Sequence, residues 1–178
     1  MKGNSTMNKT RVLALCSIFS ALGVIILYLG ALVEVLDLSM AVVASLLVIM
    51  AVIELGGVYP WLVYAVTSVL ALLLLPNKFA AVVYFGFAGF YPILKAKLER
   101  VSGLTCLVLK LVVFNLCMLA MYGVARLLSL TLELEFALWM IALTLNLLFV
   151  FYDIALTRLI GAYLHVWRKK LKIDKWMH

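Results

Sequence analysis

Residues 12–33 read VLALCSIFSALGVIILYLGALV and contain no charged side chain. A helix needs about 20 consecutive apolar residues to cross about 30 Å of lipid hydrocarbon. The preceding residues, MKGNSTMNKTR, resemble the charged start of a signal peptide, but the apolar run is too long for a signal-peptide core and no AxA-type cleavage site follows it. We therefore predict that this stretch is a retained membrane-spanning helix.

The composition of the whole chain fits the same environment. Of its 178 residues, 67% are hydrophobic and 13% are charged, whereas soluble domains are about half apolar and a quarter charged. We predict an all-α, polytopic integral membrane protein in which residues 1–178 form one domain, a six-helix transmembrane bundle. The predicted spans, separated by charged residues, prolines and glycines, are 11–33, 39–53, 58–75, 79–94, 104–128 and 136–163, followed by a basic cytoplasmic tail at 164–178.

The basic residues indicate which ends of the spans face the cytoplasm. If the N-terminus is inside and the chain crosses six times, the inner side holds Lys2, Lys9, Arg11, Lys95, Lys97, Arg100, Arg158, Arg168, Lys169, Lys170, Lys172 and Lys175. The outer side holds Lys78 and Arg126, and Lys110 lies within the fifth span. Cytoplasmic loops of membrane proteins carry such an excess of Lys and Arg. We predict a multi-pass protein of the plasma membrane with both termini in the cytoplasm.

Several classes of protein are disfavoured by what the sequence lacks. It has no HExxH, GxSxG or P-loop motif, and its two histidines, His165 and His178, lie near the C-terminus. The cysteines Cys16, Cys106 and Cys117 are odd in number and lie in apolar runs without a CxxC pair. We therefore expect no enzyme, no cofactor, no metal site and no nucleic-acid partner, and we assign the net charge of +7 to topology and lipid contact.

Two charged residues, Lys110 and Asp153, lie well away from the ends of the predicted spans, where an unpaired charge costs a few kcal/mol or more. Lys110 lies about six residues from the inner end of the fifth span, and Asp153 lies five residues before Arg158, which should mark the inner end of the sixth. At 1.5 Å rise per residue, both come to roughly 8–10 Å deep. Adjacent antiparallel helices could bring them together as a buried ion pair that fixes the helix register. A gating or ion-coupled role, or separate snorkelling of each side chain to the surface, remains the alternative.

Polar and aromatic residues gather near the predicted outer ends of the spans, where they could line a pocket for a small polar or zwitterionic molecule. Ordinary solvated loop charge is the alternative for each of them. Near the midplane, Asn115 and Asn146 could bridge the last two helices or contact a substrate. The predicted substrate-binding residues are Glu34, Asp37, Asn77, Lys78, Tyr84, Tyr122, Arg126, Trp139 and Asn146, and Glu133 and Glu135 lie at the same rim.

Small residues recur on the first span at Ala14, Ser17 and Ala21. Spacings of three and four residues place them on one helix face, where another helix can approach closely. This face packs either within the same bundle or against a partner subunit.

These features resemble one known family, the substrate-binding S-components of energy-coupling factor (ECF) vitamin transporters. The family has chains of this size with six spans and no ATP motif, and an AxxxA-type motif on its first helix docks on a transmembrane coupling protein. Here the matching segment is ALCSIFSA, with Ala14, Ser17 and Ala21 at the small positions and Ile18 breaking the strict pattern. The resemblance implies capture of a vitamin-like molecule from the outer side, with a coupling protein and two ATPase subunits as partners.

A second function class is a membrane scaffold that binds proteins and no solute, similar to the small multi-span protein of the bacterial cell-shape machinery. An outward-facing polar pocket would favour solute capture, whereas a fully apolar interior would favour the scaffold.

Overall fold

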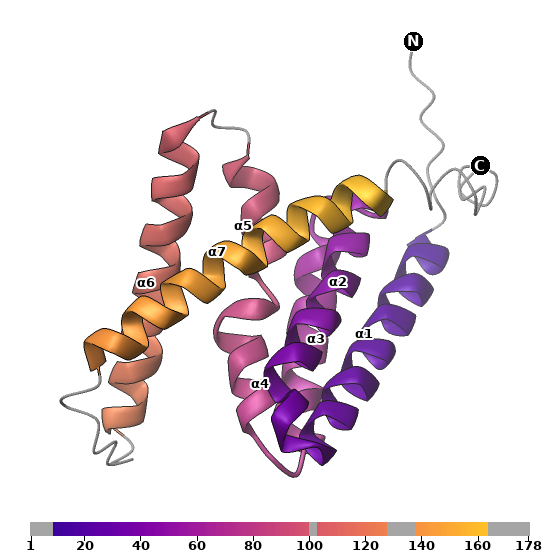
Figure 1. Ribbon diagram of the computed structural model, residues 1–178. Coiled ribbons are helices and arrows are strands. Elements are labelled where there is room, and N and C mark those ends of the chain that lie inside the picture. Colours follow the sequence, from indigo (N-terminus) through magenta and orange to yellow (C-terminus); the bar gives the residue numbers. More distant parts are fainter. Residues whose placement is uncertain (1–8, 100–102, 128–137, 164–178) are drawn as a thin grey trace.

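A computed structural model of the chain describes residues 9–99, 103–127 and 138–163. Over these ranges the protein consists of helices and turns and has no β-strand (Figure 1). The helices are α1 (Lys9–Leu32), the short 3₁₀-helix η1 (Glu34–Leu36), α2 (Asp37–Glu54), α3 (Tyr59–Leu74), α4 (Phe79–Val83), the π-helix η2 (Tyr84–Ala88), α5 (Tyr91–Leu98), α6 (Leu104–Leu127) and α7 (Leu138–Ala162). Each of the six predicted apolar runs is therefore helical along most of its length.

Five helical segments are long and apolar enough to cross a membrane. They are Lys9–Leu32, Asp37–Glu54, Phe79–Leu98, Thr105–Val124 and Met140–Ala162. The sixth apolar helix, α3, has 16 residues and is shorter than the other five. The fold class is thus an all-α bundle whose long apolar helices indicate a membrane protein.

Large aliphatic side chains cover the outer surface of the described helices. Ile25 of α1 is 54% exposed, Leu73 of α3 is 72% exposed and Leu143 of α7 is 73% exposed. A helix that is apolar on all sides suits lipid, because lipid takes the place of water around the outward side chains.

The first four helices share one hydrophobic core, in which small residues let the helix backbones approach each other. A Cβ atom added at Gly30 of α1 would lie 2.7 Å from Cβ of Met40 on α2, and one added at Gly23 would lie 3.0 Å from Cγ2 of Thr67 on α3. The turn between α2 and α3 needs glycine for a different reason: Gly56 and Gly57 have φ angles of +63° and +57°, which other residues rarely adopt.

The fourth predicted span is a broken helix composed of α4, η2 and α5. Pro92 lies in the first turn of α5, where its missing N–H is tolerated. In the π-helix, the hydroxyl of Tyr64 donates a hydrogen bond of 2.8 Å to the carbonyl oxygen of Phe85, so a side chain of α3 bonds the irregular backbone. The prediction ended this span at residue 94, but the helix continues to Leu98 because Lys95 is buried instead of marking the membrane surface.

The last two helices pack more loosely than the first five. Only 11% of the α6 span and 17% of the α7 span are buried, compared with 56% of Phe79–Leu98. Figure 1 shows α7 running obliquely across α6 toward α2, and α7 contacts both helices. A second hydrophobic cluster joins these helices to the bundle; its buried members are Ile49, Tyr91, Phe114, Phe149 and Leu156.

Candidate functional site: a buried charged cluster between α5, α6 and α7

Three helices each contribute a charged side chain to one buried cluster. Lys95 comes from α5, Lys110 from α6 and Asp153 from α7. Nζ of Lys110 lies 2.9 Å from Oδ2 and 3.1 Å from Oδ1 of Asp153, and Nζ of Lys95 donates to the same Oδ1 atom. The predicted pair of Lys110 and Asp153 is therefore present, and it is part of a larger network.

Both lysines are almost completely removed from solvent and lipid. The side chain of Lys95 is 1% exposed and that of Lys110 is 7% exposed. Snorkelling of Lys110 to the surface, one of the alternatives, does not occur. An ammonium group in such a place needs a charged partner and further acceptors, because burying it alone costs several kcal/mol. Lys95 has both, since it also donates to Oγ1 of Thr157 at 2.8 Å.

Glu99 closes the cluster on the side toward the end of α5. Its Oε1 atom lies 2.8 Å from Nζ of Lys95 and 3.2 Å from Nζ of Lys110, so one carboxylate oxygen bridges both ammonium groups. Glu99 follows the last residue of α5 and its side chain is 41% exposed. Partial burial acts to raise the pKa of Glu99, but the Lys95 and Lys110 ammonium groups outweigh it and hold the pKa below its ordinary value.

Aromatic rings surround the cluster on the side toward the bundle centre. The hydroxyl of Tyr91 donates a 2.6 Å hydrogen bond to Oδ1 of Asp153. The centroid of the Tyr91 ring lies 4.9 Å from that of Phe87 and 5.3 Å from that of Phe149. Tyr152, the residue directly before Asp153 on α7, shares a hydrogen bond of 3.0 Å with the hydroxyl of Ser45 on α2. These rings keep water away from Asp153, which strengthens its interactions with the two lysines.

Sequence reasoning missed Lys95, Glu99 and Tyr91 as members of this cluster. The sequence places Lys95 just beyond the predicted fourth span, because a charged residue normally marks the end of a span, and Glu99 follows it in the same connection. The i, i+4 spacing of Tyr91, Lys95 and Glu99 could have identified them, since it places all three on one helix face.

The two midplane asparagines pair with each other. Nδ2 of Asn115 donates to Oδ1 of Asn146 at 2.8 Å, and Nδ2 of Asn146 donates back to Oδ1 of Asn115 at 3.1 Å. Each amide also donates to a carbonyl oxygen of its own helix, Leu111 for Asn115 and Ala142 for Asn146. All four side-chain N–H groups of the pair are used in these hydrogen bonds. The pair therefore bridges α6 and α7, which is the first of the two alternatives expected for these residues.

Some of the predicted substrate-binding residues meet at the other end of the bundle. Nδ2 of Asn77 donates to Oδ2 of Asp37 at 3.1 Å, and Nζ of Lys78 donates to the carbonyl oxygen of Leu75 at 2.6 Å. Asp37 is 3% exposed. This group ties the start of α2 to the connection between α3 and α4.

The remaining predicted substrate-binding residues lie elsewhere. Tyr84 is 1% exposed in the core of the first bundle, and Tyr122 is partly exposed on α6. The side chains of Glu34, Arg126 and Trp139 lie outside the described part of the structure, as do Glu133 and Glu135. Among the described residues, the structure thus brings Asp37 and Asn77 together, whereas the ammonium group of Lys78 bonds the backbone of Leu75. It does not join this pair with Tyr84, Tyr122 or Asn146 in one pocket.

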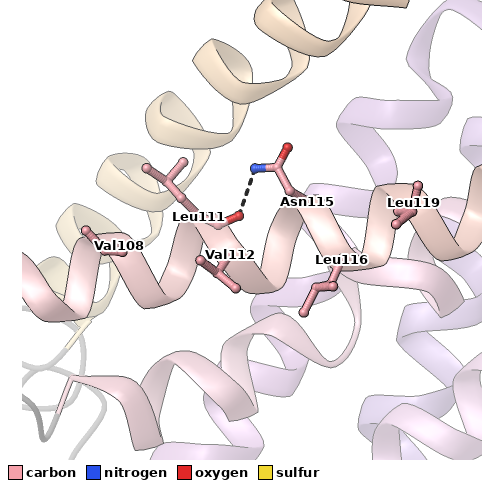
Figure 2. Close-up of a pocket in the computed structure, with 6 residues that line it drawn as sticks. All are labelled: Val108, Leu111, Val112, Asn115, Leu116 and Leu119. Atoms are coloured by element: carbon pink, nitrogen blue, oxygen red, sulfur yellow. Dashed lines mark hydrogen bonds between the residues drawn. The ribbon is translucent and has the colours of Figure 1, made fainter.

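An open groove of about 390 Å³ lies along α6 (Figure 2). Figure 2 shows that Leu111 and Asn115 point to the same side of the helix, whereas Val112 and Leu116 point to another. The groove is lined by Val108, Leu111, Val112, Asn115, Leu116 and Leu119. Apart from the amide of Asn115, which already pairs with Asn146, the lining is aliphatic. Of the described residues expected to contact a substrate, only Asn115 lines the groove, and its amide is already used by Asn146.

The small-residue face of α1 lies on the outside of the bundle. Ala14, Ser17 and Ala21 are all exposed, and the hydroxyl of Ser17 donates to the carbonyl oxygen of Leu13 within the same helix at 3.0 Å. Of the two expectations for this face, packing within the same bundle does not hold in this structure. The face is open to lipid or to another helix.

The described residues contain no grouping of His, Cys, Asp or Glu side chains that could hold a metal ion. Comparison with known proteins adds no relative: no protein-family model, curated protein or solved structure matches the chain.

Proposed function

We propose that this protein is the membrane-embedded substrate-capture subunit of an ECF-type transporter and acts through docking of α1 on a transmembrane coupling protein. The observation that carries the proposal is the exposed face formed by Ala14, Ser17 and Ala21. Small side chains on a lipid-exposed helix face let a second helix approach closely, and van der Waals packing drives association of helices in lipid. In this role the protein performs no chemistry itself; a vitamin-like molecule would bind from the outer side, and two ATPase subunits would supply the energy.

The proposal includes six membrane crossings with both termini in the cytoplasm. The helix that decides the number is α3, whose 16 residues span about 24 Å at 1.5 Å per residue, less than about 30 Å of hydrocarbon. Several observations support a crossing. Helix α3 packs beside α1, and its first turn carries Tyr59 and Trp61, residue types that favour the headgroup zone. The basic residues then lie mostly on one side of the membrane.

Affinity purification of the tagged protein from its native membrane tests the docking step. The proposal predicts that the protein brings down one further membrane subunit and two ATPase subunits. Ala21→Leu should abolish this capture while leaving the protein folded, because the added side chain projects away from the bundle. Ala120→Leu provides the matched control, since Ala120 is also exposed but lies on α6. Loss of capture in both variants, or in neither, would contradict the docking face.

The scaffold role is the second candidate, and one observation favours it. The groove on α6 is lined mainly by aliphatic side chains, and the predicted substrate-binding residues are not gathered around it. A scaffold would bring down proteins of cell-wall synthesis in the same purification, without ATPase subunits. Mass spectrometry of small molecules that co-purify with the protein separates the two roles further: one recurring vitamin-sized compound supports capture, and an empty sample supports the scaffold.

A further inference from the structure

The charged cluster has one member that can leave it and three that cannot. Lys95 and Lys110 are buried, and Asp153 is held inside α7 by both lysines and by Tyr91. Glu99, in contrast, lies beyond the end of α5 and is 41% exposed. If the Glu99 carboxylate turns toward water it regains its hydration, whereas the two ammonium groups stay in place.

Removal of Glu99 from the cluster leaves an excess of positive charge. Two ammonium groups then face the single carboxylate of Asp153, so one unit of positive charge is buried without a partner. Such a charge requires a replacement anion, because an uncompensated buried charge is strongly destabilising. The replacement must present oxygen atoms that can accept hydrogen bonds from both Nζ atoms, as Oε1 of Glu99 does at 2.8 and 3.2 Å.

The surroundings of Glu99 favour an anion that arrives at the membrane surface. The exposed basic side chains of Lys9, Arg11, Lys97 and Arg158 belong to the same end of the spans, where α1 begins and α5 and α7 end (Figure 1). Among the described residues outside the cluster, Glu54 is an acidic group at this end, and it accepts a 3.0 Å hydrogen bond from Tyr163. Exposed basic side chains at the ends of membrane helices attract anionic lipids, and basic pockets between membrane helices bind the headgroups of such lipids.

We infer that Lys95 and Lys110 form a binding site for a phosphate group. When no phosphate is bound, the Glu99 carboxylate occupies this site, and a phosphate that binds there displaces Glu99. The phosphate oxygens accept hydrogen bonds from both ammonium groups. Asp153 holds the two lysines in place and is itself held by the hydroxyl of Tyr91. The phosphate belongs either to the headgroup of an anionic lipid or to a free phosphate ion, both of which present anionic oxygens that accept hydrogen bonds.

Native mass spectrometry of the detergent-purified protein, with phosphatidylglycerol and phosphatidylcholine offered together, tests the site. Glu99→Gln should bind phosphatidylglycerol about tenfold more tightly than the wild type, because one competing charge-assisted interaction is removed. Glu54→Gln removes the same charge at the same end without touching the lysines, so its affinity should equal that of the wild type. Equal affinity in Glu99→Gln and Glu54→Gln would overturn the inference.

Two further measurements complete the test. Inorganic phosphate that displaces the lipid from Glu99→Gln identifies free phosphate as a ligand, whereas bound lipid that phosphate cannot displace identifies the headgroup. If Glu99→Gln does not fold in phosphatidylcholine vesicles, its folding is measured again in vesicles that also contain phosphatidylglycerol. Recovery there supports the site, and failure in both kinds of vesicle overturns it.

Discussion

Replacement of Asp153 by Asn removes the carboxylate that Lys95 and Lys110 share. The two ammonium groups then have only Glu99 as a charged partner, and the formal charge of the cluster rises from zero to +1. Loss of one partner from a buried ion pair costs about 3–5 kcal/mol. We expect a loss near 3 kcal/mol, at the lower end of that range, because Glu99 stays in place and Asn keeps an oxygen acceptor for Tyr91.

A second substitution separates charge balance from packing. In Asp153→Asn combined with Lys110→Met, one ammonium group is removed and the formal charge of the cluster returns to zero. We expect roughly half of the lost stability to return. Recovery should not be complete, because Lys95 still lacks the Asp153 carboxylate. Lys97→Met is the matched control, since Lys97 is exposed and its ammonium group lies over the ring of Trp61 instead of in the cluster.

The assay is the free energy of unfolding of each variant, measured by titration with sodium dodecyl sulfate in mixed micelles. The reasoning fails if Asp153→Asn lies within about 0.5 kcal/mol of the wild type, which is the ordinary range for a surface substitution. It also fails if Lys97→Met restores the Asp153→Asn protein as well as Lys110→Met does, because the effect would then come from net charge and not from the buried cluster.

Three other predictions use the same assay. The pKa of Glu99 is lowered from its ordinary value of 4.5, so Glu99 contributes its full stabilisation above pH 4.5. This stabilisation is lost as the pH falls through the lowered pKa. Glu99→Gln should therefore make stability less dependent on pH in that acidic range. Gly89→Ala should cost about 1–3 kcal/mol, because a Cβ atom there would lie 2.7 and 2.8 Å from two tyrosine rings, whereas Gly123→Ala, with nothing within 4 Å, should cost far less. Asn115→Leu should cost about 0.6 kcal/mol, the average for hydrogen bonds between membrane helices; a cost of several kcal/mol would show that the amide does more than bridge α6 and α7.

The helices could be predicted from the sequence because apolar runs in this chain are long and clearly interrupted. The first run, residues 11–33, differs from α1 by two residues at its start and one at its end. The fourth run was harder, since a charged residue normally ends a span. Lys95 continues the helix because Asp153, which is 58 residues away in the sequence, neutralises it. Local sequence holds no information about that partner.

The depth of a residue in the membrane could also be estimated from the sequence. The similar depths of Lys110 and Asp153 predicted their ion pair, which the structure contains. The rotation of each helix about its axis could not be estimated, because helices that are apolar on all sides give no clear amphipathic pattern. Tyr84 illustrates the difference: its depth suggested a place at an outer pocket, yet the π-helix turns its side chain into the core of the first bundle.

The small-residue face shows what spacing alone can and cannot decide. The spacing of Ala14, Ser17 and Ala21 correctly places them on one face of a helix. Spacing does not tell whether that face turns inward or outward. The structure shows that it turns outward, because Gly23 and Gly30 take up the close contacts of α1 with α3 and α2 instead.

The number of membrane crossings is tested most directly by the accessibility of tags at the two ends of the protein in sealed membrane vesicles. Six crossings, including that of the short helix α3, place both tags on the cytoplasmic face, where a protease added from the opposite side cleaves neither. Cleavage of one tag and protection of the other would mean an odd number of crossings and would contradict the account.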